Sequence, residues 1–459
     1  MTSSGPQSHQ APDGEGAAAG GGGTPAHDPE NRPVVSLLRD ANFLVFWTGQ
    51  TLSQLGAQLG AIALPVLAVV LLQASEWEVG VLNAANTAAF LLVGLPVGAW
   101  VDRWFKRRVM IRADLARVVA MLAIPVLWYA GVLQMWQLWI IAAAIGVANV
   151  FFDVSYQSSI PSLVERDQIS EANAKLETTG QISRLAGPAL GGALLVVFLP
   201  PVLFIGQAAG YLISALCLWR VRDHEVLQPA PAEHHLVAEI REGLGYVLHH
   251  PLIGRIAATT AITNFFSTIV FTLLPILVLR TLGLDTVQLG LIYSAGAVGG
   301  LIAASLTPYV ARIVGEGTSL PISSALTGVG MAGFPLSTLA PDATSAFLVL
   351  ACSMFVMTFG VLVYNIIQVS LRQRICPHRL LGRMNASIRF LVWGVMPLAA
   401  ILAGILGERF GLVPALWVGV VGCVAAALPL VFSPLARMRT LPDEVEHDAG
   451  APGEEPPAR

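Results

Sequence analysis

The chain carries two related segments about 210 residues apart, in the same order. Leu64–Leu67 reads Leu-Pro-Val-Leu and Leu274–Leu277 reads Leu-Pro-Ile-Leu, and each precedes a similar apolar run, at 78–82 and at 288–292. Further pairs follow at a separation of about 212 residues: Asp153 with Asn365, Asn173 with Asn385, Ala174 with Ala386, and Gly192 with Gly404. The chain is therefore predicted to consist of two halves that run in the same direction.

Apolar runs of about 20 residues, long enough to cross ~30 Å of hydrocarbon, recur throughout the chain. Apolar residues make up 55% of the sequence and charged residues 12%, a balance that excludes a soluble globular protein of this length. The predicted fold is an all-α polytopic membrane protein with twelve transmembrane helices in two six-helix halves. The spans are about 43–72, 78–101, 109–131, 136–158, 177–199 and 201–220, then 253–280, 286–311, 319–340, 344–371, 384–407 and 411–433. Two repeated membrane halves are typical of a transporter whose halves rock about a central cavity.

Polar segments divide the chain into five parts. Residues 1–40, rich in Gly, Ala and Pro, and the acidic residues 434–459 are predicted to be disordered tails. Residues 41–220 and 253–433 form the two six-helix halves. Between them, 221–252 is a linker in which an amphipathic stretch from Glu233 to His250 could lie as a helix at the membrane surface.

Positive charge is concentrated in alternate loops, which predicts the orientation because cytoplasmic loops retain Lys and Arg. The basic loops contain Arg103, Lys106, Arg107, Arg108 and Arg112 after the second span, and Arg372, Arg374, Arg379 and Arg383 after the tenth. The opposite loops offer little beyond Arg280 and Arg409. Both termini and the linker are therefore predicted to face the cytoplasm, in a chain that sits in the cell membrane.

The loop after the second span contains an acid followed by a basic cluster. Its residues are Gly98, Asp102, Arg103, Lys106, Arg107 and Arg108. An acid at a helix end can face the positive N-terminus of a neighbouring helix, while the arginines bind carboxylates or anionic lipid headgroups. We expect Asp102, an arginine and Asp153 to form a cytoplasmic gate network. The alternative is that the arginines only reflect the usual composition of short cytoplasmic loops.

With the twelve spans and the repeat, this loop resembles the signature of the major facilitator superfamily, in which Gly-x-x-x-Asp-Arg precedes a basic pair. Phe105 stands where that signature usually has Gly, and the equivalent loop of the second half, near Pro308 to Arg312, keeps only fragments of it.

The fifth span contains a second motif, formed by Gly187, Pro188, Gly191 and Gly192. Proline removes one backbone hydrogen bond and bends the helix, and the glycines allow close packing against another span. We interpret the motif as a packing kink without direct chemistry. It is similar to the fifth-helix motif of superfamily antiporters and exporters, which favours efflux over uptake.

A narrower resemblance extends over about Arg39 to Arg437. Four spaced segments carry it: Trp47–Gln50, Asp114–Arg117, Asp153–Val164 and Glu171–Ala174. They look like the branch that includes enterobactin exporters and macrolide efflux proteins, whose members export siderophores or drugs. The resemblance implies an exporter of a siderophore, antibiotic or other secondary metabolite.

Ionisable residues within spans need a reason, because their burial in lipid is costly. Asp114 and Arg117 are one helical turn apart and can neutralise each other. Arg184 could contact an anionic substrate, or it could serve only a structural role by bonding to helix-end carbonyls. Because Leu55–Gln58 contains no acid where this branch often has one, Asp114 and Asp153 are the candidates for proton carriers in a proton-coupled exporter.

Neutral polar residues at helical spacing predict the cavity wall. The candidates are Gln50, Gln54, Gln58, Asn83, Asn86, Asn264, Tyr364, Asn365 and Trp393. The alternative for each polar stripe is hydrogen bonding between helices. A largely neutral lining with aromatic side chains suits a bulky amphipathic organic solute.

Other functional classes receive little support from the sequence. It has no His-Glu-x-x-His motif, no Gly-x-x-x-x-Gly-Lys-Ser/Thr phosphate loop, no Cys-x-x-Cys pair and no basic stripe for nucleic acid. We therefore expect neither an enzyme nor a primary pump, no metal or cofactor, and a monomer whose partners are the solute, protons and the bilayer. The alternatives that remain are an importer of the same fold and a membrane sensor or scaffold that does not transport.

Overall fold

The computed structural model describes residue 37 and residues 40–101, 103–164, 168–222, 236–377 and 380–438. Most of the two predicted tails and much of the predicted linker therefore lie outside the described residues. Within these ranges all regular secondary structure is helical.

The helices of the first half occupy the predicted order. They are α1 (Ala41–Val66), the π-helix η2 (Leu67–Leu71), α2 (Glu76–Val101), α3 (Lys106–Tyr129), α4 (Met135–Leu163), α5 (Ile169–Val197) and α6 (Pro200–Arg220). A shorter helix, α7 (Leu236–His249), precedes the second half. The second half contains α8 (Ile253–Ile276), the π-helix η4 (Leu277–Thr281), α9 (Thr286–Val314), α10 (Glu316–Met331), α11 (Gly333–Leu336), the 3-10 turn η5 (Ser337–Leu339), α12 (Ala343–Ile375), α13 (Leu381–Gly394), α14 (Met396–Phe410), α15 (Leu412–Ala425), α16 (Leu428–Val431) and η6 (Pro434–Arg437).

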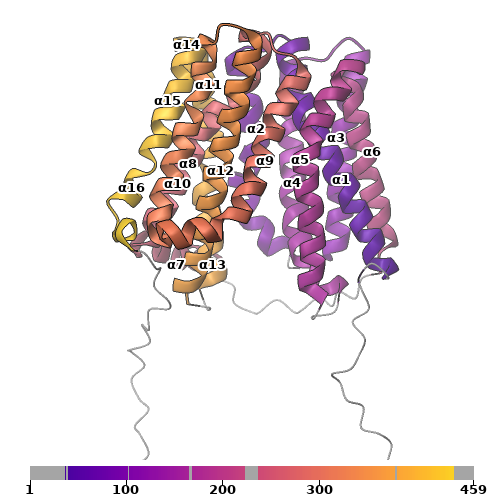
Figure 1. Cartoon of the computed structure of the whole chain (residues 1–459). Coiled ribbons are helices and arrows are strands. Elements are labelled where there is room, and N and C mark those ends of the chain that lie inside the picture. The colour runs from indigo at the N-terminus through magenta and orange to yellow at the C-terminus, as the bar shows by residue number, and fades with distance from the viewer. Residues whose placement is uncertain are drawn as a thin grey trace, which may run out of the picture.

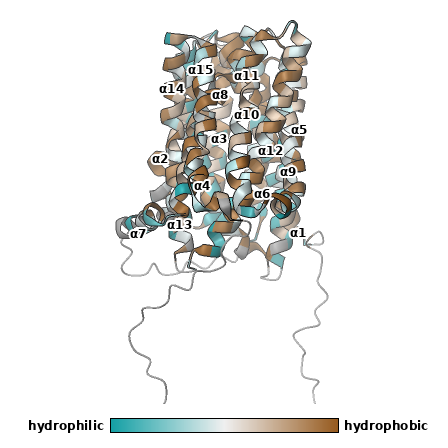
Figure 2. Ribbon diagram, turned by 60° about the vertical axis from the view of Figure 1, so that its left-hand side comes forward, coloured by the Kyte–Doolittle hydropathy of each residue, from teal (hydrophilic) through white to brown (hydrophobic). Residues whose placement is uncertain are grey.

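Nine helical segments among the described residues are long and apolar enough to cross a membrane. Helices α2, α3 and α5 lie in the other three predicted ranges but are not among these nine. Figure 2 shows apolar residues along most of the bundle and more hydrophilic ones near α7 and α13. The structure is therefore that of a multi-pass helical membrane protein.

Three spans that the sequence predicts as single helices are divided in the structure. The breaks fall beside Pro335, Pro397 and Pro429, at the α10–α11, α13–α14 and α15–α16 junctions. Proline donates no backbone hydrogen bond and clashes with the preceding turn, which explains why each helix is interrupted there.

The repeat predicted from the sequence reappears in backbone detail. Leu72 donates its N–H to the carbonyl of Leu67 at 3.0 Å, and Leu282 donates to Leu277 at 2.9 Å, so that the same π-helical turn closes both η2 and η4. The packing repeats as well: α1 packs on α6 as α8 packs on α15, and α2 packs on α4 as α9 packs on α12. The two halves thus share one architecture.

The halves are joined at the end of the bundle that carries η2 and η4, which we call the closed end (Figure 1, top). Here α5 packs on α9, and α2 packs on α14 in the reciprocal contact. The hydrogen bonds that link described residues of the two halves all lie here. They run from Arg280 to the carbonyls of Val69 and Ala74 at 3.1 and 2.8 Å, from Thr286 to Gly192 at 3.1 Å, from Ser294 to Leu185 at 2.9 Å and from Asn83 to Thr272 at 2.6 Å.

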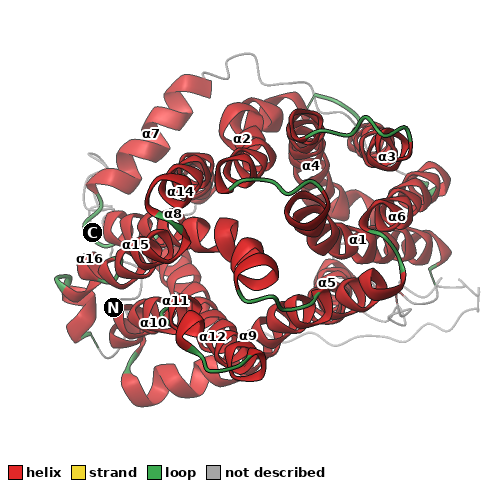
Figure 3. Ribbon diagram, turned by 90° about the horizontal axis from the view of Figure 1, so that it is seen from above, coloured by secondary structure: helices red, strands yellow, loops and turns green. Residues whose placement is uncertain are grey.

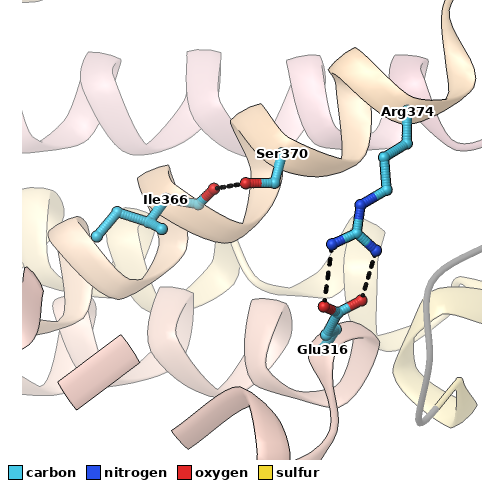
Figure 4. Close-up of polar contacts among 4 residues, drawn as sticks. All are labelled: Glu316, Ile366, Ser370 and Arg374. Carbon is cyan, nitrogen blue, oxygen red and sulfur yellow. Dashed lines mark hydrogen bonds and ion pairs between the residues drawn. The ribbon is translucent and has the colours of Figure 1, made fainter. Parts of the chain in front are cut away.

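The opposite end, which we call the open end, carries α7 and α13 and the described ends of the chain (Figure 1, bottom). There the second half is tied together internally. Arg374 of α12 binds the carboxylate of Glu316 at the start of α10 through two hydrogen bonds of 3.1 and 3.2 Å, and Ser370 donates to the carbonyl of Ile366 (Figure 4). The bidentate geometry fixes the angle between α10 and α12 at this end.

Helix α7 lies on its side along the edge of the bundle and packs on α13 and α8 (Figure 3). Arg383 forms an ion pair with Glu242, and Tyr246 donates to the carbonyl of Ile375 at 3.4 Å. His250 then accepts weak hydrogen bonds of 3.3 Å from Leu252 and Ile253 at the start of α8. Burial lowers the pKa of His250, which keeps its ring neutral and able to accept. The amphipathic segment is thus docked on the second half.

Valine at Gly243 is expected to detach α7, since a β-carbon there would lie 2.7 Å from the carbonyl oxygen of Arg383. Gly245 provides the matched control, because a β-carbon at that position meets nothing within 4 Å. Hydrogen exchange of α7 amides should rise at least tenfold in Gly243→Val, which corresponds to a loss of about 1.4 kcal/mol in the free energy of local opening. In Gly245→Val the exchange should stay near wild type. Equal exchange in both variants would show that this contact does not hold the helix.

Candidate functional site: a central cavity between the halves

A cavity of about 800 Å³ lies against the first half and is called the first chamber. Helices α1, α4 and α5 supply most of its wall. The polar and charged side chains that line it are Gln50, Ser53, Gln54, Gln58, Arg117, Asn149, Asp153, Tyr156, Gln157, Asn173, Glu177, Arg184, Tyr211 and Arg389.

A cavity of about 710 Å³ lies against the second half and is called the second chamber. Its polar lining comes mainly from α8, α12 and α13: Gln157, Thr260, Asn264, Asn365, Gln368, Arg372, Asn385 and Arg389. Phe90 and Trp393 line both chambers, and their ring centroids are 4.6 Å apart. The chambers are therefore two parts of one central space, separated by an aromatic pair contributed by both halves.

Two smaller pockets extend this space. One, of about 390 Å³, is lined by Asn86 and Asp153; the other, of about 430 Å³, is lined by Asn83, Asn264 and Tyr364. A space of this size, with apolar, aromatic and dispersed polar walls, can hold a drug-sized organic molecule.

All nine residues predicted for the cavity wall line one of these four spaces. Some also make the alternative interhelical hydrogen bonds. Tyr364 bonds with the hydroxyl of Thr260 at 2.8 Å and donates to the carbonyl of Ile256 at 3.1 Å, Asn264 donates to the carbonyl of Val392 at 3.2 Å, and Asn83 bridges to α8. These three side chains hold helices together as well as line the wall, and a role of the nine in binding stays a prediction.

Asp114 and Arg117 form an ion pair of 3.0 Å on α3, as their spacing predicts. The residues are 0% and 4% exposed, and the guanidinium also lies over the rings of Phe152 and Tyr211, 4.2 and 5.2 Å from their centroids. The second carboxylate oxygen of Asp114 has no hydrogen-bond donor among the described residues. Arg117 lines the first chamber, whereas Asp114 lies behind it.

Asp153 lies on α4 and lines the first chamber and the pocket beside it. No cation lies within ion-pair distance of it among the described residues, although Arg117 and Arg389 line the same chamber. Arg184 lines the same chamber from α5 and is exposed. Three of the four charges predicted for the membrane interior, Arg117, Asp153 and Arg184, thus line one cavity.

The predicted gate loop is described in part. Asp102 lies outside the described residues, Arg103 is exposed, Arg107 donates to the carbonyl of Val221, and the guanidinium of Arg108 lies 4.9 Å from the ring centroid of Phe105. Lys106 begins α3, and Gly98 lies in the last turn of α2. A network linking Asp102 through an arginine to Asp153 stays a prediction.

The fifth-span motif lies where three helices meet. Gly187 and Gly191 face α1, with β-carbon positions 2.3 Å from Cβ of Gln58 and 3.5 Å from Cβ of Ile62. Pro188 and Gly192 face α9 of the other half, beside Gly290 and Thr286. Ser294 of α9 donates to the carbonyl of Leu185, in the turn before Pro188. The motif is thus part of the closed end, in line with a packing role.

The cavity residues that the sequence analysis did not predict include two arginines, Arg372 and Arg389. The sequence places Arg372 in the basic loop after the tenth span, but it lies inside α12, and Arg389 lies inside α13. A signal was available for Arg389, because it is an ionisable residue within the predicted span 384–407 and therefore needed a reason. Its counterpart in the repeat, 212 residues earlier, is Glu177, which also lines the first chamber.

Comparison with known proteins gives a consistent assignment. The model of the Major Facilitator Superfamily matches residues 46–400. The enterobactin exporter EntS of Salmonella choleraesuis (strain SC-B67) is 27% identical over 357 residues, which cover 75% of this chain and 80% of that protein. Macrolide efflux protein A of Streptococcus pyogenes is 21% identical over 377 residues, 80% of this chain and 90% of that protein.

The fold agrees with this. The crystal structure of a bacterial homologue of the iron transporter ferroportin, in an inward-facing state, superposes with a TM-score of 0.68 at 19% identity and covers 86% of this chain and 99% of that one. Through its sequence and its two-half helical fold, the chain belongs to the Major Facilitator Superfamily of transporters.

Proposed function

We propose that this protein exports a bulky organic solute across the cell membrane by alternating access, with protons moving in the opposite direction. The observation that carries the proposal is a drug-sized cavity between two repeated halves that hydrogen-bond to each other only at one end among the described residues. A site enclosed by repeats becomes accessible from the other side when the halves rock about it.

The orientation belongs to the same proposal. Twelve crossings, with the open end, both termini and the linker in the cytoplasm, agree with the basic residues Arg103, Arg107 and Arg108 at that end. The cavity would then receive solute from the cytoplasm. The efflux names of EntS and macrolide efflux protein A support export of a siderophore or an antibiotic.

The test is solute accumulation in cells that lack the protein, that express it, or that express a variant with a blocked closed end, Gly290→Val. Siderophores and hydrophobic antibiotics are compared with and without a protonophore. Lower accumulation only with the active protein in energised cells supports gradient-driven export. Higher accumulation would instead indicate an importer, and no difference for any solute would favour a sensor or scaffold.

Proton coupling is tested separately with Asp153→Asn and Asp114→Asn. We expect Asp153→Asn to lower proton-driven efflux by at least about tenfold, the size of effect that loss of a proton-transfer group commonly has, while solute exchange without a pH gradient persists. Efflux is measured in proteoliposomes with an imposed pH gradient. Asp342→Asn is the control, because Asp342 is an exposed helix cap that asparagine replaces well. Full activity of the Asp114→Asn/Asp153→Asn double variant would rule out both carriers.

A further inference from the structure

We infer that the second chamber binds the negatively charged group of the solute, so that the transported molecule is an organic anion with an aromatic or apolar body. The inference rests on the proposed transport function and names the chemical class of its solute.

The charges of the second chamber are unbalanced. Arg372 and Arg389 both line it, one from α12 and one from α13, and no carboxylate is among its described lining residues. Neither guanidinium forms an ion pair with a described carboxylate. Cations beside low-dielectric walls favour an anionic partner, because the walls weaken screening by water.

The first chamber differs in this respect. Its cations Arg117 and Arg184 share the wall with Asp153 and Glu177, and Arg117 is already paired with Asp114. Arg389 also lines this chamber, in which Asp153 and Glu177 supply negative charge. The positive charge without a local counter-charge therefore lies on the second-half side, around Arg372.

Two buried polar atoms in this region have no hydrogen-bond partner among the described residues. Gln368 is 4% exposed and its Oε1 accepts no hydrogen bond, and Nε of Arg372, one turn further along α12, donates none. Gln368 donates only one long bond of 3.4 Å, to Asn365. An unpaired donor on a guanidinium beside an unpaired amide oxygen suits a ligand that carries an anionic oxygen next to a hydroxyl or N–H group.

Aromatic rings lie next to these cations. Arg389 lies over Trp393, 5.6 Å from its ring centroid, and Trp393 contacts Phe90. The cation–π contact directs the guanidinium while the remaining ring surface is available to an apolar body. Phe390 completes this side of the wall. The chamber thus combines donors for an anion with surfaces for an aromatic scaffold.

The experiment compares three fluorescent probes that share one aromatic scaffold. Dansylglycine is an anion, dansylamide is neutral and dansylcadaverine is a cation at pH 7.4. Each is titrated into the purified full-length protein in detergent, and the rise of dansyl fluorescence gives Kd. We expect dansylglycine to bind at least about tenfold more tightly than dansylcadaverine, which corresponds to about 1.4 kcal/mol.

The variants Arg372→Gln and Arg389→Gln should each weaken dansylglycine binding about tenfold and change dansylamide binding less than about twofold. Arg389→Lys should keep most of the preference, since it keeps the charge. Arg312→Gln is the matched control, an exposed arginine near the end of α9 that lines none of the four spaces. Thermal unfolding of each variant shows that it is folded.

Equal binding of anion and cation, an unchanged preference in both glutamine variants, or no binding of any probe below about 1 mM would overturn the inference. Failure of the proposed function is a separate result, because binding in detergent needs no transport. Charge-selective binding without flux in proteoliposomes would leave the site standing and remove the exporter. Flux of cationic solutes that does not depend on Arg372 and Arg389 would support transport but remove the anion site.

Discussion

Replacing Gly290 with valine is expected to reduce transport by at least tenfold. A β-carbon at Gly290 would lie 2.3 Å from the carbonyl oxygen of Pro188, closer than any normal contact, and the obstructing atom belongs to the backbone of α5. Overpacking of this kind costs about 1–3 kcal/mol or more. The cost falls only on the conformation in which α9 and α5 touch, so the variant should shift the population away from the closed-end contact.

Two measurements test this expectation. Solute efflux in proteoliposomes reports the rate, and distances between spin labels on α5 and α9 report whether the closed end has opened. Gly206→Val in α6 is the control, because a β-carbon at Gly206 meets nothing within 4 Å. The two substitutions change helix propensity equally, so only the contact differs between them. Wild-type rates and distances in Gly290→Val would show that the halves need not approach here during transport.

Replacing Arg117 with methionine is expected to destabilise the protein more than any other single charge removal. Asp114 is fully buried. Among the described residues, Arg117 is the only charged residue that pairs with it. Removing one partner of a buried pair leaves an uncompensated charge, and such changes cost about 3–5 kcal/mol. The ring contacts of the guanidinium with Phe152 and Tyr211 would be lost as well.

The double variant Asp114→Asn/Arg117→Met is expected to recover much of this loss, because it removes the uncompensated charge. The midpoint of thermal unfolding in detergent gives the four corners of the double-mutant cycle. Lys175→Met is the control: Lys175 pairs with Glu171 at 3.3 Å, and both side chains are partly exposed to solvent, so its loss should cost under about 1 kcal/mol. A midpoint for Arg117→Met close to that of Lys175→Met would show that Asp114 is not held as a buried charge.

Features that depend on local spacing could be predicted from the sequence. The lengths of the apolar runs place the helices, and the i, i+3 spacing of Asp114 and Arg117 predicts their ion pair. The duplication identifies the segments that form η2 and η4 as equivalent. Polar stripes such as Gln50, Gln54 and Gln58 also follow from one helix at a time, and they do line the cavity.

Features that depend on packing between helices could not. Pro65 and Pro188 lie inside helices, whereas Pro397 divides one, and the sequence around each does not say which neighbour satisfies the freed carbonyls. Arg389 lines the cavity because α13 packs on α2 of the other half, which is decided by contacts between the halves. Likewise, the hydrogen bond of Asn83 to Thr272 joins residues 189 positions apart.

The described chain ends bear on how the two halves are connected. The start of α1, the end of α6, the helix α7 and the segment η6 all lie at the open end (Figure 1). There Asn42 donates to the carbonyl of Arg222, and η6 packs on α10. Both halves therefore start and finish on one side of the bundle. Nothing in their packing requires the first half to come first in the chain. A circularly permuted gene, or two half-genes expressed together, would meet the same geometric conditions for assembly, because the contacts that unite the halves lie at the other end.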